Sequence, residues 1–180
     1  MQILSKIWLG FMMIWTLAGC TNVPEKVTPA SDFELPKYLG TWHELARLDH
    51  SFERGLTKVT AHYSMREDGG VKVINRGFDA KSEKWKQAEG KAYFVESADI
   101  GRLKVSFFGP FYGGYNIAKL KPDYSMALVI GPNLDYAWLL ARSPNPRQQN
   151  CQPFLEEANR IGISPDRWIW VNACDKQGAD

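Results

Sequence analysis

The segment Tyr38-Leu39-Gly40-Thr41-Trp42-His43-Glu44-Leu45-Ala46-Arg47 decides the fold of this chain. Gly40 stands at the start of a strand-like run, and Trp42 follows two residues later. A second strand-like run, WLLA at 138–141, ends at Arg142. A guanidinium group that stacks on an indole ring stabilises the contact by about 0.5–2 kcal/mol. We therefore expect Arg142 to pack on Trp42 and to tie the first strand of an all-β domain to its last long strand, closing a barrel.

Between these two residues the sequence predicts a succession of strands joined by short turns. Residues 58–66 and 71–78 alternate along the chain, and the glycines between them suit a tight hairpin. Eight strands without the spacing of intervening helices favour an antiparallel up-and-down barrel or a sandwich. An eight-stranded barrel is just wide enough to hold one small ligand. The remaining strand-like runs are 85–95, 103–108, 115–120, 126–130 and 136–142.

One helix and one short strand are expected after the barrel. Asn150 can cap a helix that ends at Gly162 and carries apolar residues at helical spacing. Pro153 is tolerated only in the first turn, so we expect the helix to begin near Asn150. Residues 168–171 are the candidate final strand.

The N-terminal segment has the pattern of a secretory signal. Lys6 precedes an apolar run over 7–16, which is too short to span a bilayer stably. A short membrane-anchor helix is the alternative. The sequence Leu-Ala-Gly-Cys at 17–20 resembles the bacterial lipobox, in which the cysteine is acylated and becomes the first residue of the mature protein. We expect a signal peptide over 1–19, acylated Cys20 with a flexible tether over 20–35, a barrel domain over 36–174 and a tail over 175–180.

The charge balance of the chain argues against one class of ligand, and its cysteine content suggests a disulfide. The chain carries 22 Lys and Arg against 20 Asp and Glu and has no basic stripe, so nucleic acid binding is not expected. Cys151 and Cys174 remain once Cys20 is acylated. In an exported chain a disulfide between them is the plain interpretation, and two free buried thiols are the alternative.

These features together resemble the lipocalin family, and within it the bacterial outer-membrane lipocalins related to apolipoprotein D. Gly40 and Trp42 match the family's first motif, and Arg142 matches its third. Asp123 and Tyr124 match the loop motif between the sixth and seventh strands. The resemblance extends over residues 32–171 and implies an eight-stranded antiparallel up-and-down barrel with one C-terminal helix and a short final strand. His43 departs from the Tyr usual in the closest branch.

The resemblance also implies that one face of each strand lines a cavity closed at the Trp42–Arg142 end. A mostly apolar lining with a few polar groups is typical of a site for an amphiphile. A solid core filled by the same side chains is the alternative. Asn75, Tyr115 or Arg54 are candidates for contact with a headgroup. Alternation along the strands nominates as lining Ala46, Ala61, Tyr63, Val73, Asn75, Ala92, Phe94, Leu103, Val105, Phe107, Tyr115, Ile117, Leu128 and Trp138.

Catalytic and metal chemistry are not indicated. His43, His50 and His62 lack a metal-ligand spacing, and no cofactor is expected. No cysteine lies between positions 40 and 142, which argues against the thiol chemistry of an isomerase that shares the lipocalin barrel. Glu44 shares the parity of Trp42, so it is expected to point into the barrel, where a buried carboxylate needs a partner or a raised pKa.

The sequence therefore predicts a binding protein rather than an enzyme. By the resemblance, it captures, stores or transports fatty acids or lysophospholipids at the outer membrane of a Gram-negative bacterium. It would be anchored through acylated Cys20 and face the periplasm. Thr21 after the cysteine favours the outer membrane, again by resemblance to other lipoproteins. An enzyme acting on a bound lipid or carotenoid and an interaction module that uses the outer face of the barrel are the alternatives, and the oligomeric state, with a homodimer as one option, stays open.

Overall fold

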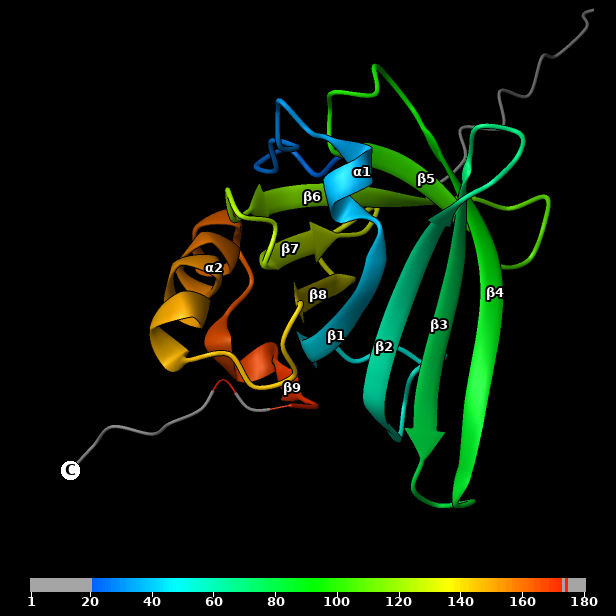
Figure 1. Ribbon diagram of the computed structural model, residues 1–180. Coiled ribbons are helices and arrows are strands. Elements are labelled where there is room, and N and C mark those ends of the chain that lie inside the picture. Colours follow the sequence, from blue (N-terminus) through cyan, green and yellow to red (C-terminus); the bar gives the residue numbers. More distant parts are fainter. Residues whose placement is uncertain (1–20, 173, 175–180) are drawn as a thin grey trace, which may run out of the picture.

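A computed structural model of the chain describes residues 21–172 and 174, so the expected signal peptide, Cys20 and the tail lie outside the described residues. The strands form one antiparallel sheet in the order β2-β3-β4-β5-β6-β7-β8-β1-β9 (Figure 1). The strands are β1 (Gly40–Arg47), β2 (Leu56–Met65), β3 (Val71–Asp79), β4 (Lys84–Phe94), β5 (Arg102–Ser106), β6 (Gly113–Leu120), β7 (Met126–Ile130), β8 (Ala137–Ala141) and β9 (Ile169–Trp170). The helices are α1 (Leu35–Tyr38), α2 (Gln148–Ile161) and the 3₁₀ helix η1 (Pro165–Arg167).

Strand β1 closes the sheet into a barrel because it pairs on both edges. Its first half pairs with β2, where Gly40 lies opposite Tyr63, and its second half pairs with β8, where Arg47 lies opposite Trp138. Each of the strands β2 to β7 pairs with the next strand along the chain. The predicted eight-stranded up-and-down barrel is therefore confirmed, with β9 as an added short strand on β1.

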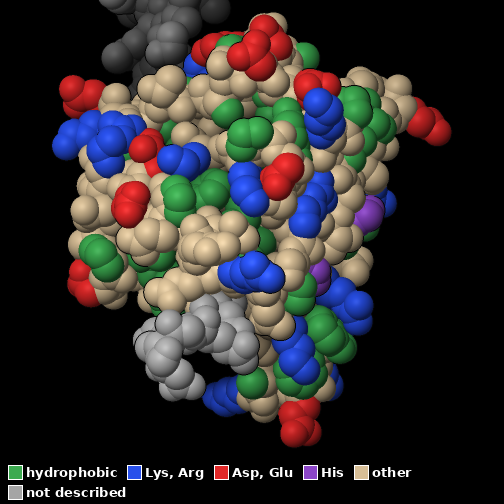
Figure 2. Space-filling model, turned by 60° about the vertical axis from the view of Figure 1, so that its left-hand side comes forward, with side chains coloured by type: hydrophobic (Ala, Val, Ile, Leu, Met, Phe, Trp, Pro, Cys, Tyr) green, Lys and Arg blue, Asp and Glu red, His purple; other side chains and the backbone are tan. Residues whose placement is uncertain are grey.

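The buried apolar side chains form two clusters. One fills the closed end of the barrel interior around Trp42, Ile117 and Val129. The other lies outside the barrel, where Leu139 and its neighbours pack against Phe154 of α2. Helix α2 accordingly lies beside β7 and β8 in Figure 1. Figure 2 shows that this flank mixes positive and negative side chains, without the continuous basic surface that nucleic acid requires.

Helix α2 begins slightly earlier than the sequence predicted. It starts at Gln148 rather than Asn150, with Pro153 inside the helix. Pro153 is the sixth residue of the helix, so the prediction that it lies in the first turn was wrong. Proline has no N–H to donate to the backbone oxygen of Gln149, and the helix continues with that one bond missing. Gly162 ends the helix in the left-handed region at φ 111°, as expected. The predicted disulfide is present, since Cys151 of α2 is bonded to Cys174 with a Cα–Cα distance of 6.4 Å.

The segment expected as a flexible tether packs against the barrel instead. The backbone N–H groups of Ala30 and Phe33 donate to Ile117 and Asp99, each over 2.8 Å. Val27 and Phe33 are buried, at 6% and 3% exposure. The burial of these apolar side chains holds the segment on the barrel, so the folded domain begins well before residue 36. Within residues 21–172 and 174, no helix has the length and hydrophobicity to cross a membrane.

Candidate functional site

The barrel encloses a cavity of about 820 Å³. At one end its lining comes from the β1–β2, β5–β6 and β7–β8 loops, which contribute Phe52, Phe108, Phe111 and Tyr136. Phe108 and Phe111 are 81% and 78% exposed, so this end meets solvent. These loops form the mouth of the cavity.

The opposite end is closed by α1 and by Trp42. The Trp42 indole Nε1 donates to the backbone oxygen of Tyr38 over 2.8 Å, which holds α1 across the end of the barrel. The Arg142 guanidinium carbon lies 4.0 Å from the Trp42 ring centre. Its Nη atoms donate to the backbone oxygens of Lys37, Thr41 and Leu39 over 2.8–2.9 Å. The floor is therefore fastened to the first strand by a single arginine.

Gly40 makes this arrangement possible. Its φ of +93° lies in the left-handed region, and a Cβ added there would sit 3.4 Å from Arg142 Nη1. Any other residue would be strained at this φ, whatever the space around it. The loop residue Tyr124 also supports the floor, because its hydroxyl accepts from the backbone N–H of Glu34 over 2.8 Å. Asp123 accepts from the N–H and hydroxyl of Ser125 and so shapes the β6–β7 turn.

Most of the nominated residues line the cavity, and together they form an apolar wall of β2 to β6 and β8. The alanines on this wall leave space that larger side chains would fill. The ten residues are Ala61, Tyr63, Val73, Asn75, Ala92, Leu103, Val105, Phe107, Tyr115 and Trp138.

Two nominated residues, Ala46 and Leu128, lie outside the barrel, in the cluster beneath α2. The register of β1 against β8 shifts between Glu44 and Ala46. This bulge reverses which side chains face inward, so Ala46 pairs with the outward Leu139. Leu128 is opposite the same Leu139 on β7, which places it on the outer face too. The prediction from simple alternation that Ala46 and Leu128 line the cavity was therefore wrong.

Phe94 and Ile117 are inside the barrel but not on the cavity surface. Phe94 lies with its ring centre 6.1 Å from that of Phe33, among the side chains that fill the closed end. Ile117 is fully buried in the same cluster. The prediction that these two side chains line the cavity was therefore wrong, because the N-terminal segment brings Phe33 into this end and fills it.

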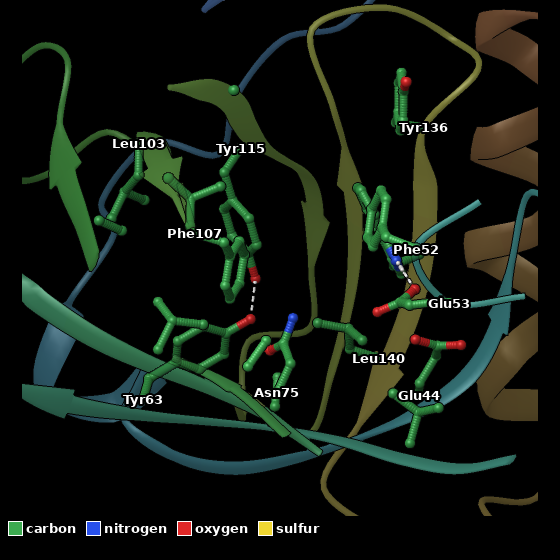
Figure 3. A pocket seen from close by; sticks show the side chains of 18 of the residues that line it. Glu44, Phe52, Glu53, Tyr63, Asn75, Leu103, Phe107, Tyr115, Tyr136 and Leu140 are labelled. Carbon is green, nitrogen blue, oxygen red and sulfur yellow. Dashed lines mark hydrogen bonds between the residues drawn. The ribbon is translucent and has the colours of Figure 1, made fainter. Parts of the chain in front are cut away.

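Three tyrosines place hydroxyl groups deep in the cavity. Tyr115 joins Tyr38 and Tyr63 through O···O contacts of 2.7 and 2.8 Å. Burial raises the pKa of all three phenols, so they are neutral. Figure 3 shows the Tyr63–Tyr115 pair facing the space from one side. Tyr38 was not nominated, because it belongs to α1 and not to a strand.

A second polar group, on the opposite side in Figure 3, contains Glu44 and Glu53. Arg47 Nη1 donates to Glu44 Oε1 over 2.5 Å, and Trp138 Nε1 donates to Glu53 Oε2 over 3.0 Å. Burial, then the charge of Glu53, raises the pKa of Glu44 to about 8, against the opposing effect of Arg47. The expected inward carboxylate at Glu44 is thus present, with a partner and a raised pKa.

Glu53 and Arg47 were missed for two different reasons. Glu53 lies in the β1–β2 loop, where no periodicity indicates a direction. Arg47 follows the β1 bulge, so its parity could not be read from the sequence. Arg54, a headgroup candidate, is not among the lining residues and pairs with Asp49 over 2.6 Å.

The histidines hold no metal site within the described part of the chain, where no group of three or more His, Cys, Asp or Glu could bind an ion. His62 Nδ1 lies 2.9 Å from Thr41 Oγ1 on an exposed surface. His50 stacks on Phe52 with ring centres 4.1 Å apart.

The comparison with known families decides the assignment. A family model described as a lipocalin-like domain matches residues 33–173. The chain belongs to the lipocalin family. This lipocalin is 53% identical to outer membrane lipoprotein Blc of Vibrio cholerae over 156 residues, which cover 86% of this chain and 91% of the relative. It is 51% identical to the Escherichia coli protein of the same name, over 82% of this chain and 84% of the relative.

Two more distant matches, one in sequence and one in fold, agree with this assignment. Apolipoprotein D of Rattus norvegicus is 32% identical over 82% of this chain and 80% of its own. The solved structure of insecticyanin from Manduca sexta superposes with a TM-score of 0.66 at 18% identity, covering 87% of this chain and 88% of that one. The names of the bacterial relatives carry no catalytic activity and agree with the predicted outer-membrane localisation.

Proposed function

We propose that this lipocalin captures single-chain lipids, fatty acids or lysophospholipids, in its barrel cavity and holds or carries them at the outer membrane. The observation that supports this most is the cavity itself, which is enclosed at one end, open at the other and lined mainly by apolar side chains. Ligand pockets commonly have volumes of about 300–1,000 Å³, and about 820 Å³ falls within that range.

The expected affinity follows from the burial of the acyl chain. About 16 methylenes at ~0.8 kcal/mol each contribute roughly 13 kcal/mol before costs. Association costs an estimated 4–15 kcal/mol, so a micromolar dissociation constant is the reasonable expectation. The fit of the acyl chain against the apolar wall would determine which lipids bind, and no covalent step would be involved.

The N-terminal end suits a role close to the membrane. Asn116 Nδ2 donates to the backbone oxygen of Asn22 over 3.3 Å, and the same oxygen would lie 3.1 Å from a Cβ at Gly114. Gly114 lines the cavity, so the first described residues lie beside the cavity wall. An acyl group on Cys20 would keep the barrel at the bilayer, with the lipid entering through the mouth.

The test is a titration of a delipidated form that begins at Thr21 with a lysophospholipid, followed by tryptophan fluorescence. Trp138 lies in the cavity wall and is expected to report occupancy. Saturable change in the micromolar range or below supports lipid capture. No saturable change in a sample shown to be folded by circular dichroism would contradict it.

A further inference from the structure

One side of the cavity brings two carboxyl groups close to a single guanidinium. Glu44 and Glu53 are 2% and 6% exposed, and both line the cavity. Arg47 donates Nη1 to Glu44 Oε1 over 2.5 Å and Nη2 to the backbone oxygen of Glu53 over 2.8 Å. The carboxyl group of Glu53 accepts instead from the neutral indole of Trp138. The guanidinium therefore balances one of the two acids.

His50 does not supply the missing positive charge. Its Nε2 lies 3.2 Å from Glu53 Oε2, yet neither ring nitrogen makes a hydrogen bond with the described residues. Burial, together with the charge of Arg47, lowers the pKa of His50 to about 4, so the ring is neutral near pH 7. Burial also raises the pKa of both Glu44 and Glu53. The group thus has two acids, one guanidinium and a neutral imidazole, which is one acid more than it has cations. One further positive charge or one proton would neutralise it.

The other cations on the cavity wall have partners of their own. Lys86 pairs with Asp79 over 2.6 Å. Arg76 lies over the Trp85 ring, with its guanidinium carbon 4.1 Å from the ring centre. Both belong to the β3–β4 hairpin, whereas Glu44 and Glu53 belong to β1 and the loop after it. Lys86 and Arg76 are therefore on different elements from the two acids.

We propose that Glu44 and Glu53 form a subsite for the positively charged nitrogen of a bound single-chain amphiphile, so that the cavity prefers an ammonium headgroup to a carboxylate. This rests on the proposed function, because it assumes that the cavity holds an amphiphile. An ammonium group supplies the missing cation and N–H donors at once. A carboxylate at the same place would add a third acid to the buried group, which like-charge repulsion disfavours.

The position of the subsite suits this orientation. Figure 3 shows the carboxyl groups of Glu44 and Glu53 close together on one side of the cavity, across from Tyr63 and Leu103. The apolar side chains Val71, Val73 and Val105 lie on β3 and β5. The acyl chain can then lie along that apolar wall while the nitrogen contacts the acids.

The test compares three amphiphiles with one shared chain: tetradecylamine, tetradecanoate and tetradecanol. Their dissociation constants are measured below micelle formation by tryptophan fluorescence, with the delipidated protein from Thr21 onward at neutral pH. We expect tetradecylamine to bind about tenfold or more tightly than tetradecanoate, with tetradecanol between them. In E53Q and in E44Q, which keep the size of each side chain, we expect this ratio to fall about fivefold or more.

E67Q is the matched control, because Glu67 is an exposed acid in the β2–β3 turn and lies outside the cavity lining. The amine-to-carboxylate ratio of this variant should equal that of the parent. Unchanged affinity for tetradecanol shows that a variant is folded with its cavity intact.

Three results would overturn the inference. Equal affinities for amine and carboxylate in a protein that binds tetradecanol would remove the subsite and leave lipid capture standing. A preference for tetradecanoate would place the headgroup at Lys86 and Arg76 instead. Failure of all three amphiphiles to bind the folded protein would contradict the proposed function itself.

Discussion

The guanidinium carbon of Arg142 lies 4.0 Å from the centre of the Trp42 ring, and the same side chain donates to three backbone oxygens between Lys37 and Thr41. One residue at the end of β8 thereby holds the first strand, α1 and the floor of the barrel together. The floor is what makes the interior a cavity with a single mouth.

Replacement of Arg142 should therefore destabilise the fold more than it affects lipid binding. We expect R142A to lower the free energy of unfolding by about 2–4 kcal/mol, from the lost cation–π contact and charge-assisted hydrogen bonds. R142K should recover only part of this, because an ammonium cannot reach several acceptors in the fork geometry of a guanidinium. Urea denaturation measures both variants. A loss below about 0.5 kcal/mol in R142A would contradict this role.

The disulfide between Cys151 and Cys174 should stabilise the folded state. It joins positions 23 residues apart and holds the chain after β9 to α2. We expect C174S to lower the stability by about 2–4 kcal/mol. Reductant should lower the stability of the parent by the same amount and leave C174S unchanged. If the reduced parent, with its thiols shown to be free, unfolds at the same urea concentration as the oxidised one, the disulfide contributes nothing to stability.

The buried Glu44 gives the fold a pH dependence in the alkaline direction. Its folded pKa of about 8 lies above its ordinary value of 4.5, so the folded chain holds a proton that the unfolded chain has already lost. Stability therefore falls as the pH rises through this interval, by about 1 kcal/mol between about pH 7 and about pH 9. His50, whose pKa is lowered from 6.5 to about 4, costs stability only at lower pH.

The measurement is the urea midpoint of the parent and of E44Q over this pH range. In E44Q the fall of stability with pH should be at most half of that in the parent. The remaining pH dependence comes from Glu53, whose pKa is also raised. E67Q, at an exposed position, should keep the parent slope. A parent whose stability is flat or rises from about pH 7 to about pH 9 would show that Glu44 is ionised at no cost.

Trp138 should be a main contact for the bound lipid. Its side chain lines the cavity and is fixed by its hydrogen bond to Glu53. We expect W138A to weaken lysophospholipid binding by about tenfold or more, measured by isothermal titration calorimetry. W85F is the matched control, because Trp85 is 48% exposed and is not among the lining residues. Equal lipid affinity in W138A and the parent would remove Trp138 from the site.

Much of the fold could be predicted because its signals are local. Alternating side chains and glycine-containing turns indicate the strands, and two residues, Trp42 and Arg142, indicate how the sheet closes. The cavity wall followed wherever strands are regular, as at Val73 and Leu103. In these regions the period of two residues fixes which face points inward.

The misses come from places where that period is broken or absent. The β1 bulge turns Ala46 outward and Arg47 inward. No residue pattern around Leu45 indicates that a bulge is present. Glu53 reaches the cavity from a loop, where direction depends on tertiary contacts. The N-terminal segment packs through Val27 and Phe33, two apolar residues too widely spaced to form a pattern.

The most direct test of lipid capture is to locate the acyl chain. A lysophospholipid with bromine atoms on its chain quenches tryptophan fluorescence only at short range, so it can be titrated into the parent, W138F and W85F. Lipid capture predicts strong quenching in the parent and W85F, and a large loss of the quenched signal in W138F. Quenching that is unchanged in W138F but lost in W85F would place the lipid on the outer surface and contradict the account.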